Sequence, residues 1–529
     1  MALTLASAAR LLTRHHLLRE IIQDDRWSLD PHRFDGADTP FEAVTYDTRT
    51  VSPGSLLFCK GRFKSAYLDG IDDRGLAAYV AQTDHSSATH AVGLIVNDVR
   101  KAMSLLSAEF YGRPQDELTV IGITGTKGKT TTNYFTQAVL NAINGNRTAL
   151  FSSVDNCVDG HTYVESDLTT PESLDAFRMM RQAVDHGMTH LVMEVSSQAY
   201  KVDRVYGLTF DVAAFLNISP DHISPIEHPT FEDYLHCKRQ IVANAKRLVL
   251  GADCAHADLI REDAAAAGIE VSTFALHNAG RDEGTAADVI AWPVDPAHSA
   301  YEIAADGRDL GTFHLRLDGD FNYLNAAAAV ALVKAAGFDP ADADVAQALH
   351  AMESVRISGR MEQFRDTESN TLAIVDYAHN FASVSALLDF IDERYGAEHP
   401  RVTVVTGSAG DKAVDRRKEI VDACQHRAER LILTFEDTDT EPVIDVCRQM
   451  LGYVTDPNIE AGIILDRTEA IETAVADARE HCARDGRPNV IMVIGKGEEQ
   501  WMKDRGRHVP YEGDTHIVSR VFKLGDETR

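Results

Sequence analysis

A short apolar run followed by a glycine-rich loop, residues 118–130, limits most strongly what this chain can fold into. The run ends at Ile123, the sequence Gly-Thr-Lys-Gly-Lys-Thr extends from Gly125 to Thr130, and residues 131–142 suit a helix. A strand, a glycine loop and a helix in this order are typical of phosphate-binding loops, in which backbone N–H groups and the helix N-terminus surround a polyphosphate. The sequence therefore predicts an α/β domain that binds a nucleoside triphosphate.

The loop departs from the usual spacing, because five residues separate Gly122 from Gly128 where the usual pattern has four. The alternative is a glycine-rich turn with a surface lysine, but the preceding strand and the following threonines favour a phosphate-binding loop. Lys129 can then reach the outer phosphates, and the Thr130 hydroxyl can bind Mg²⁺. The residues that we expect to contact the nucleotide here are Gly125, Thr126, Lys127, Gly128, Lys129, Thr130 and Thr131.

Length, charge and cysteine content argue against several classes of protein. A chain of 529 residues is too long for one core and suggests about three or four domains. Its net charge of −29 disfavours binding to nucleic acid or to an anionic membrane. The seven cysteines are scattered without a Cys-x-x-Cys pair, so neither a disulfide framework nor a zinc site is indicated. No signal peptide or membrane-spanning run is visible, and we expect a cytoplasmic protein.

Short apolar runs alternate with helix-length segments, which predicts mostly parallel sheets covered by helices. The expected strands are residues 119–123, 148–152, 191–195, 211–216 and 248–250 in a central domain, and 371–375, 402–406, 431–434, 462–465 and 489–494 in a C-terminal domain. Residues 1–20 predict an amphipathic helix, and residues 271–315 suggest a small antiparallel extension of the central domain. We therefore expect three α/β domains, at residues 1–113, 114–355 and 356–529.

Polar side chains follow two neighbouring predicted strands, at the edge that carries ligand sites in open α/β sheets. Glu194 follows one strand and is a candidate Mg²⁺ ligand beside Thr130, with a solvated carboxylate as the equal alternative. His222 follows the next strand at the same edge, which favours a ligand over a surface histidine. Lys238 comes sixteen residues later and by itself would be an exposed helix lysine.

Three further motifs are weaker by themselves. Thr169 and Thr170 lie in a turn that starts a helix. Asn322 and Asn325 precede an alanine-rich segment, where they could contact an adenine or cap the helix, and capping is the more ordinary role. Asp376 ends a predicted strand of the C-terminal domain, and it would face the nucleotide if the domains close together.

These pieces occur in one order along the chain, and in that order they resemble the Mur ligase family, ATP-dependent amide ligases of peptidoglycan precursor synthesis. The motifs that carry the resemblance are residues 125–130, 169–172, 194–197, 217–222, 319–325, 359–362 and 376–379. The segment Tyr46-Asp47-Thr48-Arg49, with Pro53, Gly54 and Gly61, resembles the UDP-binding domain of the members that add the third amino acid. The resemblance spans essentially the whole chain.

The resemblance implies a role for each domain and for individual residues. The N-terminal domain would bind UDP, the central domain would be a phosphate-loop ATPase, and a Rossmann-like C-terminal domain would bind the amino acid. One Mg²⁺ would lie near Thr130 and Glu194 and a second near His222 and a carbamylated Lys238, whose carbamate supplies anionic oxygens. The other residues implied are Asn322, Asn325, Arg360 and Asp376 for ATP; Thr48, Thr169, Thr170, Ser196 and Arg204 for the UDP-sugar–dipeptide; and Arg417, Asp437, Asp439 and Glu499 for the amino acid.

The implied reaction starts when a substrate carboxylate attacks the γ-phosphate of ATP and forms an acyl phosphate. The incoming amine then displaces phosphate. Lys129, Glu194, His222 and Lys238 would contribute mainly by positioning and by neutralising charge. The implied partners are small molecules alone, namely ATP, the amino acid and UDP-MurNAc-L-Ala-D-Glu, and we expect a monomer.

Two departures from the family pattern bear on activity and on the amino acid. Gln198 and Glu498 stand where most relatives have histidine. Relatives that add meso-diaminopimelate carry an arginine for its distal carboxylate, whereas Asp439 falls at that position here, downstream of the basic stretch 407–417. A carboxylate repels another carboxylate and suits an ammonium. We therefore predict addition of L-lysine to the D-Glu γ-carboxylate, with L-ornithine as the close variant, unless this loop has drifted and selectivity lies elsewhere.

Three alternatives stay open at this point. A meso-diaminopimelate ligase is the nearest competitor. Folylpolyglutamate synthetases share the ATPase core and the ligase domain but lack the region around residues 47–54. A catalytically silent relative that binds nucleotide or UDP-sugar is also compatible with Gln198 and Glu498, although Lys129, Glu194, His222 and Lys238 argue against it.

Overall fold

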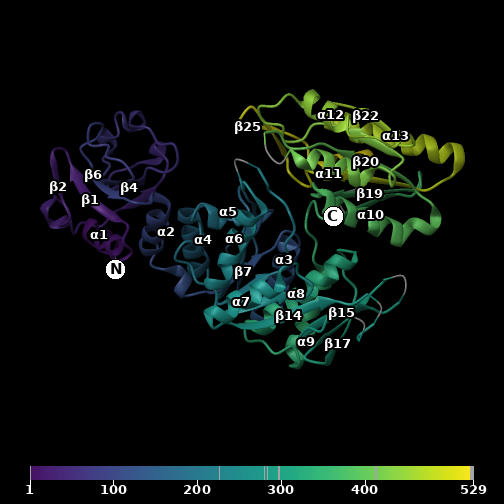
Figure 1. Ribbon diagram of the computed structural model, residues 1–529, viewed down its shortest axis with the longest axis horizontal. Helices are drawn as coiled ribbons and strands as arrows, with labels where there is room; N and C mark the ends of the chain where they lie inside the picture. Colours follow the sequence, from purple (N-terminus) through teal and green to yellow (C-terminus); the bar gives the residue numbers. More distant parts are fainter. Residues whose placement is uncertain are drawn as a thin grey trace.

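Three large β-sheets divide the molecule into three lobes that follow one another along the chain (Figure 1). The computed structural model describes residues 2–224, 227–278, 280–282, 284–295, 298–411 and 414–524. Each sheet has a parallel core, and helices cover its faces, so the predicted three-part α/β architecture is confirmed. The exact residues at which one domain passes into the next stay a prediction.

The N-terminal lobe is built on a six-stranded sheet of order β2-β1-β6-β5-β4-β3. Strands β3 to β6 are parallel, and β1 pairs antiparallel with β6. The elements are α1 (Leu5–Arg14), β1 (Leu18–Gln23), β2 (Arg26–Ser28), β3 (Ala43–Thr45), β4 (Ser55–Phe58), β5 (Ala78–Ala81), β6 (Val92–Val96) and α2 (Val99–Phe110). Leu12 of α1 and Leu106 of α2 are both buried in the core that covers this sheet.

The predicted helix over residues 1–20 is wrong in its second half. Helix α1 ends at Arg14, and the chain turns at His16, whose φ is 57°. Leu18 then enters strand β1, where Ile21 is buried against the sheet. The apolar residues that suggested one long helix therefore serve two elements, because the left-handed backbone at His16 breaks the helical repeat.

The central lobe carries an eleven-stranded sheet of order β10-β9-β8-β11-β7-β12-β13-β14-β15-β16-β17. Its strands are β7 (Thr119–Thr124), β8 (Thr148–Phe151), β9 (Asp155–Cys157), β10 (Tyr163–Glu165), β11 (His190–Glu194), β12 (Val212–Phe215), β13 (Arg247–Gly251), β14 (Glu270–Leu276), β15 (Val289–Pro293), β16 (Tyr301–Ala305) and β17 (Arg308–Phe313). Its helices are α3 (Lys129–Asn144), α4 (Ser173–Asp185), α5 (Ser197–Lys201), α6 (Phe231–Ala243), α7 (Ala257–Ala267), α8 (Asp320–Ala335) and α9 (Ala343–Leu349).

The antiparallel extension predicted for residues 271–315 is confirmed in part. Strands β14 and β15 continue the parallel sheet, β16 pairs antiparallel with β15, and β17 pairs antiparallel with β16. At the centre, β7 lies between the parallel strands β11 and β12. The loops after these three strands therefore meet at one sheet edge, which places Glu194 and His222 on the same side as the glycine-rich loop.

The C-terminal lobe has a six-stranded sheet of order β18-β19-β23-β20-β21-β22, in which only β18 runs antiparallel, and a separate two-stranded hairpin. The elements are β18 (Glu362–Asp366), β19 (Thr371–Asp376), α10 (Phe381–Tyr395), β20 (Arg401–Thr406), α11 (Asp415–Cys424), β21 (Arg430–Leu433), α12 (Val443–Leu451), β22 (Glu460–Ile463), α13 (Arg467–Asp485), β23 (Asn489–Ile494), β24 (Trp501–Asp504), β25 (Arg507–Pro510) and α14 (Asp514–Val521). All five strands predicted for this lobe are present, with ends shifted by up to two residues.

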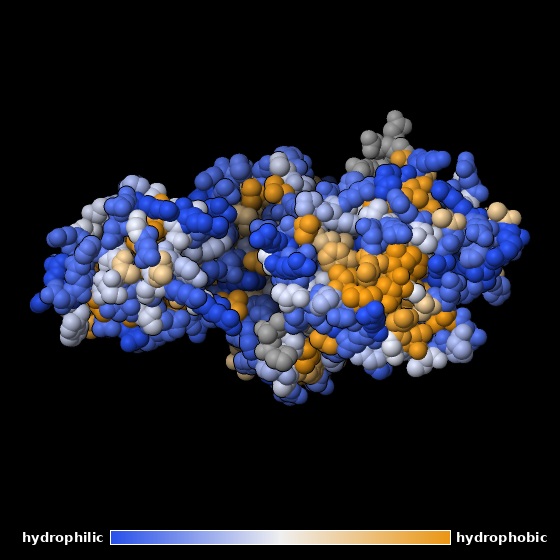
Figure 2. Space-filling view, turned by 90° about the horizontal axis from the view of Figure 1, so that it is seen from above, coloured by the Kyte–Doolittle hydropathy of each residue, from blue (hydrophilic) through white to orange (hydrophobic). Residues whose placement is uncertain are grey.

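The surface is hollowed between the N-terminal lobe, on the left in Figure 2, and the rest of the molecule. Hydrophilic residues cover most of the visible face, as the strong net charge leads one to expect. Within the described ranges, no helix has both the length and the apolar character needed to cross a membrane.

Candidate active site

The glycine-rich loop joins the central strand β7 to helix α3, as the sequence predicts. Gly128 precedes the helix with a φ of 81°, and a Cβ there would lie 2.2 Å from the side-chain oxygen of Asn325. Only glycine satisfies both the backbone and this close approach. The Lys129 Nζ donates to the carbonyl oxygens of Gly125 (3.0 Å) and Thr126 (3.2 Å). The loop therefore places the Lys129 side chain at the N-terminus of helix α3. The lysine and the helix N-terminus both favour the binding of an anion.

Asn217, which has no role predicted from the sequence, fixes the shape of this loop. Its side-chain oxygen accepts from the Lys127 N–H at 2.9 Å, and its amide donates to the Lys127 carbonyl at 3.1 Å. Its own carbonyl accepts from the Thr126 N–H at 3.2 Å. The Thr126 hydroxyl lies 3.1 Å from the hydroxyl of Tyr234 on helix α6. Bonds from the loop after β12 and from α6 thus hold the phosphate loop before any ligand binds.

Thr130 and Glu194 come together at the predicted sheet edge, with Ser153 between them. The Thr130 and Ser153 hydroxyls lie 3.0 Å apart, and the Ser153 N–H donates to Glu194 at 2.8 Å. Glu194 is buried, so its carboxylate is not simply solvated. Two hydroxyls and one carboxylate are oxygen donors of the kind that Mg²⁺ prefers. These residues therefore fit a divalent cation beside the phosphate loop, and Thr131 is buried next to them in the first turn of α3.

Lys238 is not the exposed helix lysine that its sequence position alone suggests. Only 2% of the residue is exposed, and its Nζ donates to the Gly125 carbonyl at 2.8 Å. Burial, assisted by the neighbouring Lys129, lowers the pKa of Lys238 well below its ordinary value. Among the described residues, neither Lys238 nor Lys129 forms an ion pair with a carboxylate. The amino groups of half-buried Lys129 and buried Lys238 thus share the carbonyl oxygen of Gly125.

His222 lies on the same edge but with different neighbours. Its φ is 57°, and its Nδ1 lies 3.1 Å from a carboxylate oxygen of Glu227. Its ring is 6.3 Å from the ring of Tyr234, centre to centre. His222 therefore joins the site through α6 and its own loop, without a described bond to Thr130 or Glu194.

Asn322 and Asn325 face the phosphate loop and do not cap helix α8. The residue at the capping position is Gly319, and no side chain caps the helix there. Asn325 donates to the Asn322 side-chain oxygen at 3.2 Å, while its own oxygen contacts the loop at Gly128. Both asparagines are buried. The more ordinary alternative for this pair, helix capping, is therefore wrong, and a place beside the nucleotide stays the prediction.

A buried ion pair joins the central and C-terminal lobes at this edge. Asp221 accepts from Arg416 at 2.6 Å and from the Asn380 amide at 3.1 Å, and the Lys127 Nζ lies 3.9 Å away. Burial opposes the charge on Asp221, but Arg416 and His222 hold its pKa well below the ordinary value. Asp221 thus carries a negative charge between the phosphate loop and the opposite lobe.

Asp376 and Arg360 lie on the facing side of the C-terminal lobe. Asp376 accepts backbone N–H groups of Met361 (2.9 Å) and Ala378 (2.7 Å), which fixes its carboxylate. Burial raises the pKa of Asp376, while Arg360 and Lys127 of the central lobe offset part of this rise. Lys127 of the central lobe and Asp376 of the C-terminal lobe therefore interact electrostatically.

The predicted substrate residues Thr170, Ser196 and Arg204 cluster beside the N-terminal lobe. The Thr170 hydroxyl accepts from the Ser196 N–H at 3.0 Å, and Arg204 donates to the Thr170 carbonyl at 3.2 Å. Arg204 and Lys60 of the N-terminal lobe both bind Glu172, at 3.1 and 2.6 Å. Thr169 precedes this turn. The cluster therefore presents cationic groups at the junction of two lobes, which suits an anionic substrate.

Thr48 lies farther out, in the N-terminal lobe itself. It begins a short 3₁₀ turn, Thr48–Thr50, and its carbonyl accepts from Arg74 at 2.9 Å. Two residues earlier, the Tyr46 hydroxyl donates to Asp175 of helix α4 at 2.6 Å. The segment that carries Thr48 is thus tied to the central lobe, and its contact with UDP stays a prediction.

Arg417 is buried and already bound on most of its donors. Its guanidinium contacts both carboxylate oxygens of Glu441, the Gln449 side chain and the Ala409 carbonyl. Its Nε is the donor without a partner. A grip on the α-carboxylate of an amino acid would therefore need this Nε or a rearrangement of Glu441. Lys412, in the basic stretch before Arg417, lies outside the described residues.

Lys496 forms ion pairs with two of the predicted acidic residues of the amino-acid site, Asp437 and Glu499. Its ammonium lies 2.9 Å from Asp437, contacts Glu499, and stands 4.3 Å from the ring centre of Trp501. Glu499 also accepts from the Tyr377 hydroxyl at 3.0 Å. Burial raises the pKa of Glu499 against the effect of Lys496. Asp437 and Glu499 therefore form one cluster next to the strand that ends at Asp376.

Asp439 is held by the hairpin β24–β25. Its φ is 54°, and its carboxylate pairs with Lys503 at 2.7 Å and accepts from the Gly506 N–H at 2.6 Å. Trp501, on the same hairpin, donates to Glu165 of the central lobe at 3.1 Å. An ammonium of the protein thus occupies the position at which we expect the ammonium of an amino acid.

The structure adds residues to the site that the sequence did not single out. They are Lys60, Ser153, Asn217, Asn380, Arg416, Lys496 and Lys503, and each bonds to a predicted site residue or to Glu172 or Asp221 in the motifs that carry such residues. Three of them had a signal in the sequence, since Asn217 begins the motif 217–222, Arg416 lies in the basic stretch 407–417, and Lys496 lies in the motif that ends at Glu499. The others depend on contacts between distant segments.

The phosphate loop, the cation-binding edge and the facing C-terminal lobe define a phosphate-loop enzyme of three α/β domains. Residues 123–333 match the family model of the Mur ligase middle domain, and residues 359–497 match that of the Mur ligase glutamate ligase domain. A UDP-N-acetylmuramyl-tripeptide synthetase of Bifidobacterium longum is 68% identical over 99% of this chain and 100% of its own length. The chain belongs to the Mur ligase family, as its motifs predict.

Two further comparisons are relevant to the amino acid and to the fold. A UDP-N-acetylmuramoyl-L-alanyl-D-glutamate–L-lysine ligase of Enterococcus faecalis is 39% identical, with 97% of this chain and 98% of that protein covered. A solved UDP-N-acetylmuramoyl-L-alanyl-D-glutamate–2,6-diaminopimelate ligase has a TM-score of 0.62 at 22% identity, over 98% of this chain and 99% of that one. The second likeness concerns the fold alone.

Proposed function

We propose that this chain is an ATP-dependent amide ligase that adds L-lysine to the D-Glu γ-carboxylate of UDP-MurNAc-L-Ala-D-Glu. The observation that carries the proposal is the meeting of three sites around one sheet edge. The phosphate loop, with half-buried Lys129, and the buried Lys238 of helix α6 lie between the cationic cluster at Arg204 and the acidic cluster at Glu499. This order suits a reaction that activates one substrate with ATP and then admits an amine.

The ATP-binding part rests on the loop and on its cation-binding neighbours. Lys129 can neutralise charge on the transferred phosphoryl group, and the helix N-terminus adds to this effect. Thr130, Ser153 and Glu194 would hold one Mg²⁺, which when bound supplies charge neutralisation to the phosphates. Asn322, Asn325, Arg360 and Asp376 would contact the rest of the nucleotide from two lobes.

The proposed carbamylation of Lys238 has a physical basis in its burial. Burial lowers the pKa of Lys238 and so favours its neutral amine, and the neutral amine is the form that adds to CO₂. The carbamate would place an anionic group at this buried position of helix α6. It would thereby complete a second cation site opposite Glu194.

In the proposed reaction, an oxygen of the D-Glu γ-carboxylate bonds to the γ-phosphorus while the bond to ADP breaks. The amine nitrogen then bonds to the acyl carbon, phosphate leaves with the acyl oxygen, and the nitrogen loses a proton. Arg204 and Ser196 would orient the first substrate, and Glu499 would orient the amine. The contribution of the chain is mainly to position the reactants and to exclude water.

The choice of lysine rests on the charges of the amino-acid cluster. Its carboxylates are Asp437, Asp439 and Glu499, and its ammonium groups are Lys496 and Lys503. One carboxylate is in excess, which favours a substrate with an additional ammonium over one with an additional carboxylate. The relative from Enterococcus faecalis, named as an L-lysine ligase, supports the same choice. L-Ornithine carries the same charged groups as L-lysine on a shorter side chain, so it would make the same charge interactions at a different distance.

Phosphate release in the presence of ATP, Mg²⁺ and each substrate alone or together tests the proposal. We expect release only when UDP-MurNAc-L-Ala-D-Glu and an amino acid are both present. A nucleotide-binding protein without ligase activity would show no release that depends on the substrate. Release that depends on a folate in place of the UDP-dipeptide would assign the chain to the folylpolyglutamate synthetases instead.

A further inference from the structure

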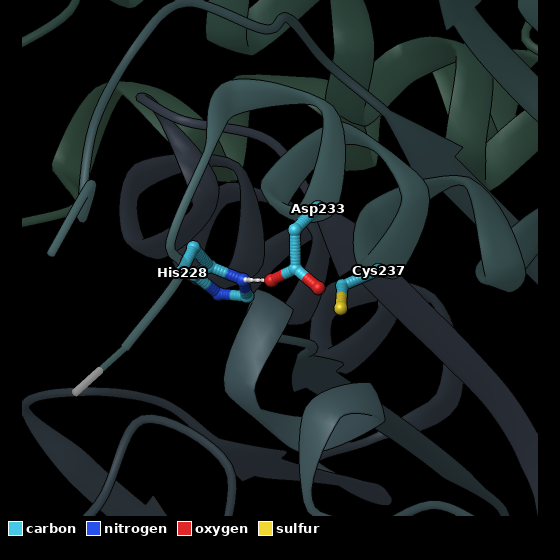
Figure 3. A group of neighbouring side chains, drawn as sticks. All are labelled: His228, Asp233 and Cys237. Atoms are coloured by element: carbon cyan, nitrogen blue, oxygen red, sulfur yellow. Dashed lines mark hydrogen bonds and ion pairs between the residues drawn. The ribbon is translucent and has the colours of Figure 1, made fainter. Parts of the chain in front are cut away.

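His228 is a buried histidine that the proposed reaction does not use. It lies between His222 and helix α6, and none of its side chain is exposed. Its Nδ1 is 2.6 Å from a carboxylate oxygen of Asp233, and its Nε2 is 2.9 Å from the Ser197 hydroxyl. Figure 3 shows the ring of His228 directed at the carboxylate of Asp233. The three side chains form a continuous serine–histidine–aspartate hydrogen-bond chain.

The direction of this chain follows from its members. Asp233 is ionised, since Lys201 and His228 hold its pKa below the ordinary value against the effect of desolvation, and a carboxylate only accepts hydrogen bonds. The Nδ1 of His228 therefore carries the proton. Burial lowers the pKa of His228 although Asp233 raises it, so the ring is neutral and Nε2 accepts from Ser197.

Neither a nucleophile nor a metal site fits this cluster. Ser197 is buried at the start of helix α5, so no substrate can reach its hydroxyl from solvent. Cys237 completes a group with His228 and Asp233 that has metal-ligating atoms within 4.8 Å of one another (Figure 3). The Lys201 ammonium, however, lies 2.7 Å from both oxygens of Asp233 and repels a cation there. The cluster is therefore a connection between structural elements.

Each partner of His228 belongs to an element that carries a proposed site residue. Ser197 directly follows Ser196 after strand β11, and Asp233 lies on helix α6 five residues before Lys238. The backbone of His228 closes the loop of His222, since its N–H donates to the His222 carbonyl at 3.3 Å. Three elements of the site thus converge on one imidazole.

The backbone of His222 needs such support. Its φ of 57° lies in the left-handed region, which costs free energy for a residue other than glycine. The loop returns at His228, whose carbonyl accepts from the Ser224 N–H at 2.8 Å. The side-chain bonds of His228 tie this return to Ser197, after strand β11, and to Asp233 on helix α6.

We propose that His228 is a positioning residue that holds the His222 loop in register with strand β11 and helix α6. Ser197 and Asp233 fix its ring on two sides, and its backbone fixes His222. The inference rests on the proposed function, because it assumes that His222 and Lys238 hold the second cation. It assigns the Ser197–His228–Asp233 chain to the organisation of that cation site.

Binding of Mn²⁺ to the full-length protein with a non-hydrolysable ATP analogue, followed by electron paramagnetic resonance, tests this without turnover. We expect His228→Ala to raise the Mn²⁺ midpoint about 10- to 100-fold, as loss of a residue that orients a metal ligand does. Ser197→Ala should also raise the Mn²⁺ midpoint, but by a smaller factor. His228→Gln, whose amide can still reach Ser197, should recover part of the affinity.

His277→Gln is the matched control, because His277 is a buried histidine of the same lobe with both ring nitrogens hydrogen-bonded. It should leave the Mn²⁺ midpoint unchanged. If His228→Ala does not fold, as judged by its unfolding midpoint, Ser197→Ala decides. An unchanged midpoint in the folded variants overturns the proposal. Failure of the wild-type protein to turn over the UDP-dipeptide, with Mn²⁺ still bound, would instead contradict the proposed function.

Discussion

Asp221 of the central lobe and Arg416 of the C-terminal lobe form a buried ion pair with a 2.6 Å contact between Oδ1 and Nη2. Asp221 also lies 3.9 Å from Lys127 of the phosphate loop. One carboxylate thus contacts the loop that we expect to bind ATP and the lobe that we expect to bind the amino acid. We therefore expect Asp221 to couple the nucleotide site to the contact between the two lobes.

Arg416→Met should open this junction. Removing one partner of a buried pair leaves an uncompensated charge, which costs about 3–5 kcal/mol. We expect turnover to fall at least about tenfold and the radius of gyration to increase in small-angle X-ray scattering. Lys246→Met is the control, because the Lys246–Asp211 pair is exposed and worth at most about 1 kcal/mol. Equal effects of both substitutions would contradict the coupling role of Asp221.

Gly128→Ala should weaken nucleotide binding. The added Cβ would meet Asn325 at 2.2 Å, and φ is already 81°. We expect the KM for ATP to rise at least about tenfold, since the loop cannot keep its shape. Gly145→Ala, at the other end of α3 with a φ of 72° and no atom within 4 Å, is the matched control. It should lower stability by about 1 kcal/mol and leave the KM unchanged.

Lys503→Met tests whether Asp439 binds the ammonium of the substrate. In our account Lys503 competes for that carboxylate, so its loss should lower the KM for L-lysine by about fivefold, which corresponds to about 1 kcal/mol. Asp439→Arg should raise the KM for L-lysine. An increased KM in Lys503→Met would mean that the pair only holds the hairpin in place.

The raised pKa of Glu436 predicts that the free energy of unfolding depends on pH. Glu436 is buried beside Gly495, with 6% of the residue exposed. Burial raises its pKa from 4.5 to about 7, although the positive charge of Arg467 acts in the opposite direction. Between these two values the folded state binds more protons than the unfolded state, so stability falls as pH rises, by about 3 kcal/mol in total. Above about pH 7 the effect is complete.

Thermal unfolding of Glu436→Gln measures this contribution. The variant should lose less stability than the wild type between about pH 5 and about pH 8, because glutamine does not titrate. Glu460→Gln, on the exposed edge strand β22, is the control and should retain the wild-type dependence. An unchanged pH dependence in Glu436→Gln would show that another group is responsible.

The parts predicted from the sequence are those with a local pattern. The strand before Gly125, the helix after Gly128 and the strand ends at Glu194 and Asp376 each carry an apolar run next to a polar motif, and all are present. Helix α1 was predicted too long, because the left-handed backbone of His16 has no strong signal in a histidine-rich turn.

The contacts that were missed join distant segments. Arg416 meets Asp221 across 195 residues, and Asn325 meets Gly128 from helix α8, which is far from it in sequence. Such pairs depend on how the lobes and layers pack against one another, and a single sequence does not reveal this packing. The ion pairs Arg417–Glu441 and Asp439–Lys503 were missed for the same reason. Their roles in binding an amino acid therefore stay predictions.

The amino-acid specificity of the reaction tests the central claim most directly. The measurement is the rate of phosphate release with ATP, Mg²⁺ and UDP-MurNAc-L-Ala-D-Glu, with L-lysine, L-ornithine or meso-diaminopimelate supplied separately, and with the tripeptide product identified by mass. We predict efficient turnover with L-lysine, weaker turnover with L-ornithine and none with meso-diaminopimelate. Turnover with meso-diaminopimelate and none with L-lysine would contradict the account.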